Sequence, residues 1–212
     1  MAKFNQGILG GFSGTVGTVV GSTWKGINYM RSKSSGRKGT ATQAQLEQRA
    51  KFAICAKLLQ PIANVLETTF KGFAVKMTGI NSALSYALKN AVTGTFPDFT
   101  IDFNHVLISR GDLVNAGNPN AAAAPNSMIK MSWTDNSNLG QARSTDKMII
   151  VLYCPDLRKF IYTIGTSNRS SGSESIDARL FAGKEVETFI SVISENEKEV
   201  AESIYTGQVR IT

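Results

Sequence analysis

The second half of the chain has the alternating apolar and polar pattern of short β-strands. Apolar runs occupy residues 100–108, 128–133, 147–153, 159–164, 175–180, 186–193 and 204–211. Turns rich in Asn, Asp, Gly and Ser separate them, and the polar stretch 115–126 crosses between the first two. This spacing is typical of an immunoglobulin-like or fibronectin-type sandwich. Trp133 alternates with Met131 and Ile129, which predicts a core anchor rather than a ligand-stacking residue.

The preceding residues have the helical period. Apolar positions recur at helical spacing at Leu46, Ala50, Ala53, Ile54, Leu58, Ile62, Val65 and Leu66. Pro61 removes a backbone donor and is expected to kink or split this helix near Leu59. A second helical pattern starts beside Asn81 and stops at Gly94. We expect both apolar faces to pack against the rest of the fold instead of forming a dedicated partner helix.

Glycines punctuate the beginning of the chain. They stand at positions 7, 10, 11, 14, 17, 21 and 26. Alternation from Trp24 to Arg31 suits a strand, and the Thr and Val residues before Gly21 suit its partner, which predicts a hairpin around Gly21 and Ser22. A phosphate-binding loop is the alternative, but the Gly-Lys-Ser/Thr and GxGxxG patterns are absent from this stretch. Tight turns and close chain packing explain the glycines better.

A basic arm, residues 31–40, follows with the sequence RSKSSGRKGT. It has four cations and no apolar residue, so it cannot bury enough apolar surface to offset the entropy of ordering it. We expect the arm to be disordered alone and to be held by a neighbouring subunit. Removal of residues 31–39 is then expected to leave the sandwich folded and to weaken assembly. Thr40 or Thr42 can cap the helix that begins at Gln43.

Together these elements predict an α+β, mainly β protein. We expect a glycine-rich hairpin and basic arm (1–40), a helical segment (41–95) and an immunoglobulin- or fibronectin-type antiparallel β-sandwich (96–212). A chain of 212 residues with 42% hydrophobic residues is large enough to fold without metals or disulfides. Residues 1–97 carry 12 Lys and Arg against 2 Asp and Glu, and residues 98–212 carry 11 against 14. The positive part is expected to face an acidic partner, nucleic acid or the acidic half of a neighbouring copy.

The sequence contains few histidine, cysteine and acidic residues in patterns typical of catalytic sites. His105 is the single histidine and lies in a strand-like stretch, so a His-based metal cluster or a Ser-His-Asp triad is not expected. Cys55 and Cys154 have neither zinc nor disulfide spacing and are predicted to be buried thiols. The acidic run from Glu195 to Glu202 is typical of a solvated hairpin edge. We therefore predict a protein that is not an enzyme, with no catalytic, cofactor-binding or metal-binding residue and no small-molecule substrate.

Two short motifs and the start of the chain bear on partners and location. Arg110, Gly111 and Asp112 spell an adhesion tripeptide, although Gly111 is equally explained as a turn residue. Asn168-Arg-Ser matches a glycosylation acceptor, which matters only in a secreted protein. Residues 8–20 are interrupted by glycines and lack a cleavage motif, so no signal peptide is predicted. With no apolar run of membrane-spanning length, a virion or cytoplasmic location is expected.

Several segments carry a resemblance. Residues 5–21 read NQGILGGFSGTVGTVVG, and WKGI and YMRS follow at 24–27 and 29–32. With TQAQ at 42–45, QRAKF at 48–52, KMTG at 76–79 and SWTD at 132–135, the chain resembles a family of Bacteroidota proteins with a domain of unknown function. The GGFSGxVGxVVG motif carries most of the likeness, which implies no catalytic residues. The Arg-Ser-Lys arm before a Gln-rich helix start also resembles parts of phage-associated structural proteins.

We therefore expect a self-assembling structural protein, a component of a virion, phage-derived particle or filament, whose partners are other copies or other structural subunits. Nucleic-acid binding through the basic arm is one alternative, and an adhesion or ligand-binding module is another. The candidate assembly or nucleic-acid contacts are Trp24, Lys25, Tyr29, Arg31, Lys33, Arg37, Lys38, Arg49 and Lys51.

Overall fold

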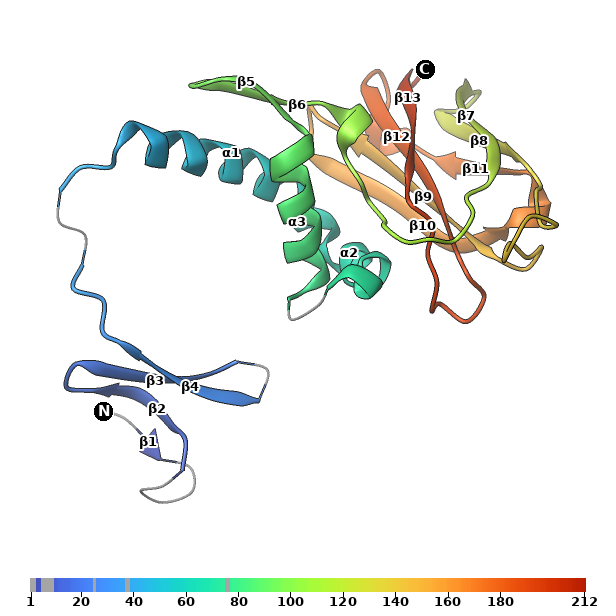
Figure 1. Ribbon diagram of the computed structural model, residues 1–212. Helices are drawn as coiled ribbons and strands as arrows, with labels where there is room; N and C mark the ends of the chain where they lie inside the picture. Colours follow the sequence, from blue (N-terminus) through green and yellow to red (C-terminus); the bar gives the residue numbers. More distant parts are fainter. Residues whose placement is uncertain (1–2, 5–9, 25, 37–38, 75–76) are drawn as a thin grey trace. The chain divides into compact units, whose positions relative to one another are not determined.

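A computed structural model describes the chain except for residues 1–2, 5–9, 25, 37–38 and 75–76 (Figure 1). The chain forms two compact units, residues 1–42 and residues 43–212. We call them the amino-terminal unit and the main unit, and each is described by itself.

The amino-terminal unit is a four-stranded antiparallel sheet in the order β1-β2-β3-β4. Its strands are β1 (Lys3–Phe4), β2 (Phe12–Val16), β3 (Val19–Trp24) and β4 (Ile27–Ser32). Gly17 takes a left-handed φ of 56° in the tight turn between β2 and β3, a conformation that favours glycine. The chain reverses again between Trp24 and Ile27, at Gly26.

The predicted hairpin at Gly21 and Ser22 is wrong, because both residues lie in the middle of β3. Gly21 pairs with Gly14 on one side and with Met30 on the other. A Cβ atom at position 21 would lie 2.3 Å from the carbonyl oxygen of Phe12 and 2.6 Å from its ring. Gly21 therefore allows close packing of Phe12 and is not a turn residue.

The helical part of the main unit is divided as the sequence predicts. Helix α1 (Gln43–Leu59) ends in a 3₁₀ turn at 60–62, and α2 (Ala63–Thr69) follows. This confirms the split at Pro61, which lies at the start of the 3₁₀ turn, where a missing N–H is tolerated. Helix α3 (Gly79–Asn90) starts slightly earlier than predicted, because the hydroxyl of Thr78 accepts a hydrogen bond from the backbone of Asn81 at 3.3 Å. The predicted end at Gly94 is wrong, because the helix ends at Asn90 and Gly94 lies in a strand.

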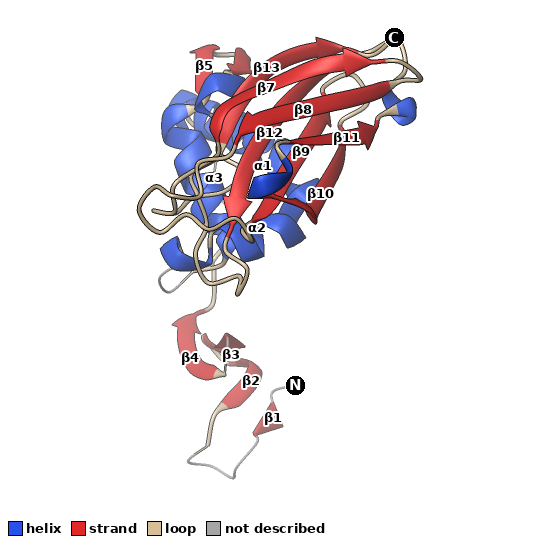
Figure 2. Ribbon diagram, turned by 90° about the vertical axis from the view of Figure 1, so that its right-hand side faces the viewer, coloured by secondary structure: helices blue, strands red, loops and turns tan. Residues whose placement is uncertain are grey.

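Two antiparallel sheets form a sandwich in the rest of the main unit (Figure 2). The three-stranded sheet has the order β11-β8-β7, and the four-stranded sheet has the order β10-β9-β12-β13. In chain order the strands are β7 (Gly117–Ala124), β8 (Met128–Thr134), β9 (Lys147–Cys154), β10 (Lys159–Asn168), β11 (Ser173–Asp177), β12 (Glu185–Ile193) and β13 (Ile204–Arg210). Trp133 is buried in the core between the sheets, which confirms the prediction that it is a core anchor.

The first predicted strand is wrong. Residues 100–108 do not form a sandwich strand: β5 (Val92–Thr95) and β6 (Asp98–Ile101) make a separate hairpin, and a 3₁₀ turn covers 103–105. His105 lies in that turn, largely exposed, with Nδ1 2.8 Å from the carboxylate of Asp102. The sandwich instead begins with β7, in the stretch predicted to be a crossing. The Asn, Pro and Ala residues of β7 have little strand preference, and β7 forms because its backbone pairs with β8.

The helices cover the outer face of the four-stranded sheet (Figure 2). Ile149, Val151 and Tyr153 of β9 share a core with α1, α2 and α3, whereas Met148 and Ile150 face the other sheet. Because both faces of β9 are buried, this strand reads as a continuous apolar run. The helical segment and the sandwich are thus parts of one three-layered unit.

Candidate functional site

One face of the amino-terminal sheet collects aromatic, aliphatic and basic side chains. Across β3 and β4 the pairs are Trp24 with Ile27, Ser22 with Tyr29, and Val20 with Arg31. Directly paired residues project from the same face of a sheet, and so do alternate residues of one strand. These six residues therefore share one face, which we call the aromatic face: Val20, Ser22, Trp24, Ile27, Tyr29 and Arg31.

The apolar residues of this unit are exposed to an unusual degree. Ile27 is 65% exposed and Met30 71% exposed, and none of the hydrophobic side chains whose exposure is described in this unit, from Gly10 onwards, is buried. All residues of β4 are exposed, and β4 forms one edge of the sheet. A sheet of this size without a covered apolar face is marginally stable at best in water. The main unit, by contrast, has two extended apolar cores.

The charge of the amino-terminal unit has a single sign. Residues 1–42 contain six Lys and Arg and no Asp or Glu. Arg31 and Lys33 are exposed, and the backbone N–H of Lys33 donates a 2.7 Å hydrogen bond to the carbonyl of Thr18. The unit therefore presents uncompensated positive charge beside exposed apolar surface, a combination that favours an acidic partner.

The structure brings only some of the predicted contact residues together. Trp24, Tyr29 and Arg31 lie on the aromatic face, and Lys33 follows β4 directly. Lys25, Arg37 and Lys38 lie outside the described residues. Arg49 and Lys51 belong to α1 in the main unit.

Lys51 has a contact of its own within the main unit. Its ammonium lies 5.0 Å from the centroid of the Phe99 ring, a cation–π contact. Arg49 and Lys51 were predicted to act with the arm because they follow it closely in the sequence. Closeness in the sequence does not show to which unit a residue belongs.

The adhesion tripeptide is built into the main unit. The guanidinium of Arg110 lies 4.4 Å from the ring centroid of Phe73 and 5.4 Å from that of Tyr86. A Cβ at Gly111 would lie 2.0 Å from the carbonyl oxygen of Val200. Both residues thus have packing roles, and Gly111 is required by close backbone approach rather than by a turn.

A buried ion pair joins the loops at one end of the sandwich, and sequence reasoning missed it. Arg169 is fully buried, and its guanidinium lies 3.1 Å from the carboxylate of Asp146. The same group donates to the carbonyls of Val114 and Asn115 at 2.7 and 3.1 Å, and to the side chain of Asn136 at 2.5 Å. The sequence around Arg169 reads as a polar turn, so no local pattern distinguishes it from a solvated arginine.

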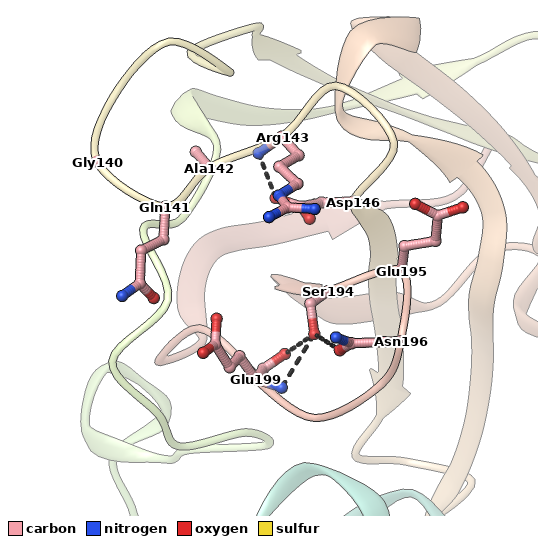
Figure 3. Close-up of a pocket in the computed structure, with 9 residues that line it drawn as sticks. All are labelled: Gly140, Gln141, Ala142, Arg143, Asp146, Ser194, Glu195, Asn196 and Glu199. Atoms are coloured by element: carbon pink, nitrogen blue, oxygen red, sulfur yellow. Dashed lines mark hydrogen bonds between the residues drawn. The ribbon is translucent and has the colours of Figure 1, made fainter.

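A polar cleft of about 690 Å³ opens beside this ion pair (Figure 3). The Ser194 hydroxyl donates to the Asn196 side chain at 2.9 Å and accepts from the Glu199 backbone at 2.9 Å. Asp146 also accepts from the backbone N–H of Arg143. Ser194 thus closes a turn, and none of its hydrogen-bond partners among the described residues is a base that could activate it. Within the described residues, no cluster of His, Cys, Asp and Glu could hold a metal ion.

Both cysteines are buried and free, as predicted. Burial raises the pKa of Cys55 from its ordinary value of 9.0 to about 11. Its thiol is therefore protonated at neutral pH, which is the unreactive form.

These features define the class of the protein: an immunoglobulin-like β-sandwich with a helical layer, preceded by a small basic sheet. In the described parts of the chain, no helix is long and apolar enough to cross a membrane. The chain belongs to a family of unknown function, DUF6266, whose model matches residues 11–207. This confirms the expected membership in a family of unknown function, and the Bacteroidota source stays a prediction.

Two solved structures of fibronectin type III domains are similar to part of this chain. The fn3 domain of human collagen alpha-1(XX) chain is 16% identical, with a TM-score of 0.36, over 49% of this chain and 90% of that domain. The FN1–FN3 domains of chicken CNTN1 are 10% identical, with a TM-score of 0.39, over 49% of this chain and 36% of that one. No curated protein sequence matches this chain.

Proposed function

We propose that this protein is a non-enzymatic structural subunit that assembles with other copies through its amino-terminal unit. The observation that carries the proposal is that none of the hydrophobic side chains whose exposure is described in this unit is buried. Burying a large apolar side chain contributes about 1.5 to 3 kcal/mol. Ile27 and Tyr29 on the aromatic face, and Met30 on the opposite face, therefore offer several kcal/mol to interfaces that cover them.

The main unit supplies a rigid body for such an assembly. Its two cores and the Arg169–Asp146 ion pair hold its own sheets, helices and loops together. In a subunit of a virion, a phage-derived particle or a filament, a stable body would be joined to a small basic sheet whose exposed apolar residues are buried by a neighbouring subunit. Positive charge on one unit and the acidic loop 195–202 of the other also favour contacts between copies.

Light scattering and negative-stain microscopy over a range of protein and salt concentrations test the proposal. Oligomers or particles that form as protein concentration rises are the expected result. A monomer at all protein concentrations, with no particles under any salt condition, would overturn the proposal.

Nucleic-acid binding is the second candidate, because the aromatic face places Trp24 and Tyr29 beside Arg31. Aromatic rings on a basic surface are the arrangement on which single-stranded nucleic acids stack. A mobility shift with a single-stranded oligonucleotide at two salt concentrations tests it. Binding should weaken at high salt and in Tyr29→Ser, and remain unchanged in Tyr162→Ser, an exposed tyrosine of the main unit. Absence of binding at low salt ends this candidate.

A further inference from the structure

An apolar groove lies between helix α1 and strand β6 of the main unit. It has a volume of about 590 Å³, within the range of small-molecule sites. Its lining residues are Ala50, Ala53, Ile54, Lys57, Leu58, Pro97, Phe99, Thr100, Ile101, Phe103, Tyr153 and Arg158. Most of these side chains are aliphatic or aromatic, so the groove suits a ligand with an apolar body.

Tyr153 adds a polar group to the lining. Its ring is mostly buried and stacks on Phe160 with centroids 4.4 Å apart. Its hydroxyl is not one of the buried atoms that lack a partner in the described structure, so it can reach the groove and solvent. Burial raises the pKa of Tyr153, and the nearby charge of Arg158 opposes that rise. At neutral pH the hydroxyl is therefore protonated and can donate a hydrogen bond to a ligand in the groove.

The charged residues of the groove are all cations. Lys57 and Arg158 line it, and Lys51 lies over the Phe99 ring at its side. None of the three forms a salt bridge within the described part of the chain, and no described Asp or Glu lines the groove. The nearby carboxylate of Glu187 accepts hydrogen bonds from Tyr205 and Gln208 instead. An O–H donor and two cations therefore line one largely apolar groove.

We propose that this groove binds a small carboxylic acid with an aliphatic body. The carboxylate accepts the hydrogen bond of the Tyr153 hydroxyl and pairs with Arg158 and Lys57, while the hydrocarbon covers Ile54, Phe99 and other apolar residues of the lining. A carboxylate fits this donor set because it accepts several hydrogen bonds at once, and charge-assisted bonds are the strong ones. This inference goes beyond the proposed assembly and is independent of it.

Calorimetric titration of the full chain with decanoate, kept below its micelle concentration, tests the inference. Decanoate is expected to bind, and decanol and decyltrimethylammonium, which share its chain length, are expected to bind at least about tenfold more weakly. Equal affinities for the three ligands would show that the cations and the hydroxyl of the groove do not contribute to binding, and would overturn the assignment. No decanoate binding at millimolar concentration would also overturn it.

Variants locate the site. Arg158→Gln is expected to weaken decanoate binding by about tenfold, and Tyr153→Phe, which keeps the stacked ring, by about threefold or more. Lys130→Gln removes an exposed cation from β8, outside the groove, and should leave the affinity unchanged. Circular dichroism checks that each variant is folded, and Arg158→Lys replaces Arg158→Gln if that variant is not. Unchanged decanoate affinity in both groove variants would overturn the assignment. An affinity for decanoate that falls as protein concentration rises would also overturn it, because a second copy of the protein would then occupy the groove.

Discussion

At the scale of single residues, Arg169 shows how a charge is held inside a mainly apolar sandwich. Its guanidinium donates to the Asp146 carboxylate, to two backbone carbonyls and to the Asn136 side chain. A buried charge is stable only when it is paired and hydrogen-bonded in this way. Its role is to join three loops that are distant in the sequence.

Arg169→Met is therefore expected to destabilise the main unit by about 3 to 5 kcal/mol, because Asp146 is left as a buried, unpaired charge. Urea unfolding followed by circular dichroism measures the loss. Arg179→Met is the matched control, since Arg179 pairs with Asp177 on the exposed surface, where solvent screens an ion pair and its loss has little effect on stability. Equal losses in the two variants would contradict the structural role of Arg169.

Cys55 gives a prediction on pH dependence. Its pKa is raised from 9.0 to about 11 in the folded protein, so folding favours the neutral thiol. The corresponding stability is fully present below pH 9 and is lost as pH rises through about 11. Thermal unfolding between pH 8 and pH 11 should show a steeper fall of Tm in the parent than in Cys55→Ala. Parallel Tm curves would contradict the burial of this thiol.

At the scale of elements, the sequence predicted those helices and strands whose limits depend on nearby residues. The split between α1 and α2 follows from Pro61, and β9 from its unbroken apolar run. Strand β7 could not be predicted, since its Asn, Pro and Ala residues become a strand only through pairing with β8. The register of the aromatic face also could not be predicted. A turn at Gly21 and Ser22 would have paired Trp24 with Val19, whereas the structure pairs it with Ile27.

The adhesion tripeptide, residues 110–112, gives a prediction at this scale. Gly111→Ala is expected to destabilise the main unit by about 1 to 3 kcal/mol, because its Cβ would lie 2.0 Å from the backbone oxygen of Val200. Gly72→Ala is the control, because a Cβ there has no described neighbour within 4 Å. Chemical unfolding of both variants measures the difference. A Gly111→Ala protein as stable as the parent would show that residues 110–112 can move away from Val200.

At the scale of the whole molecule, residues 1–42 differ from the rest of the chain both in charge and in the burial of apolar side chains. Residues 1–42 are basic and lack a described buried apolar side chain, whereas residues 43–212 contain both cores. The sequence predicted the basic character of the arm from its composition. It could not predict the exposure of Ile27, Tyr29 and Met30, because residue type alone does not determine which apolar side chains a fold leaves exposed.

The basic arm gives a prediction on assembly. Arg31 and Ser32 complete β4, so a deletion of residues 31–39 would also shorten the sheet. Replacing Lys33, Arg37 and Lys38 with Gln removes three of the six cations of residues 1–42 and leaves β4 intact. Assembly should weaken and lose much of its salt dependence, because fewer charges meet the acidic partner surface. Light scattering at low and high salt measures both, and unchanged assembly would mean that the arm makes no contact.

The most direct test of the central claim is sedimentation velocity of full-length variants altered on the aromatic face. Ile27→Ser combined with Tyr29→Ser is expected to shift the protein to smaller species while its circular dichroism is retained. Leu139→Ser, which removes an exposed leucine from the main unit, should sediment like the parent. If the double variant assembled as the parent does, or if the parent itself were a monomer at every concentration, the amino-terminal unit would not be the assembly surface.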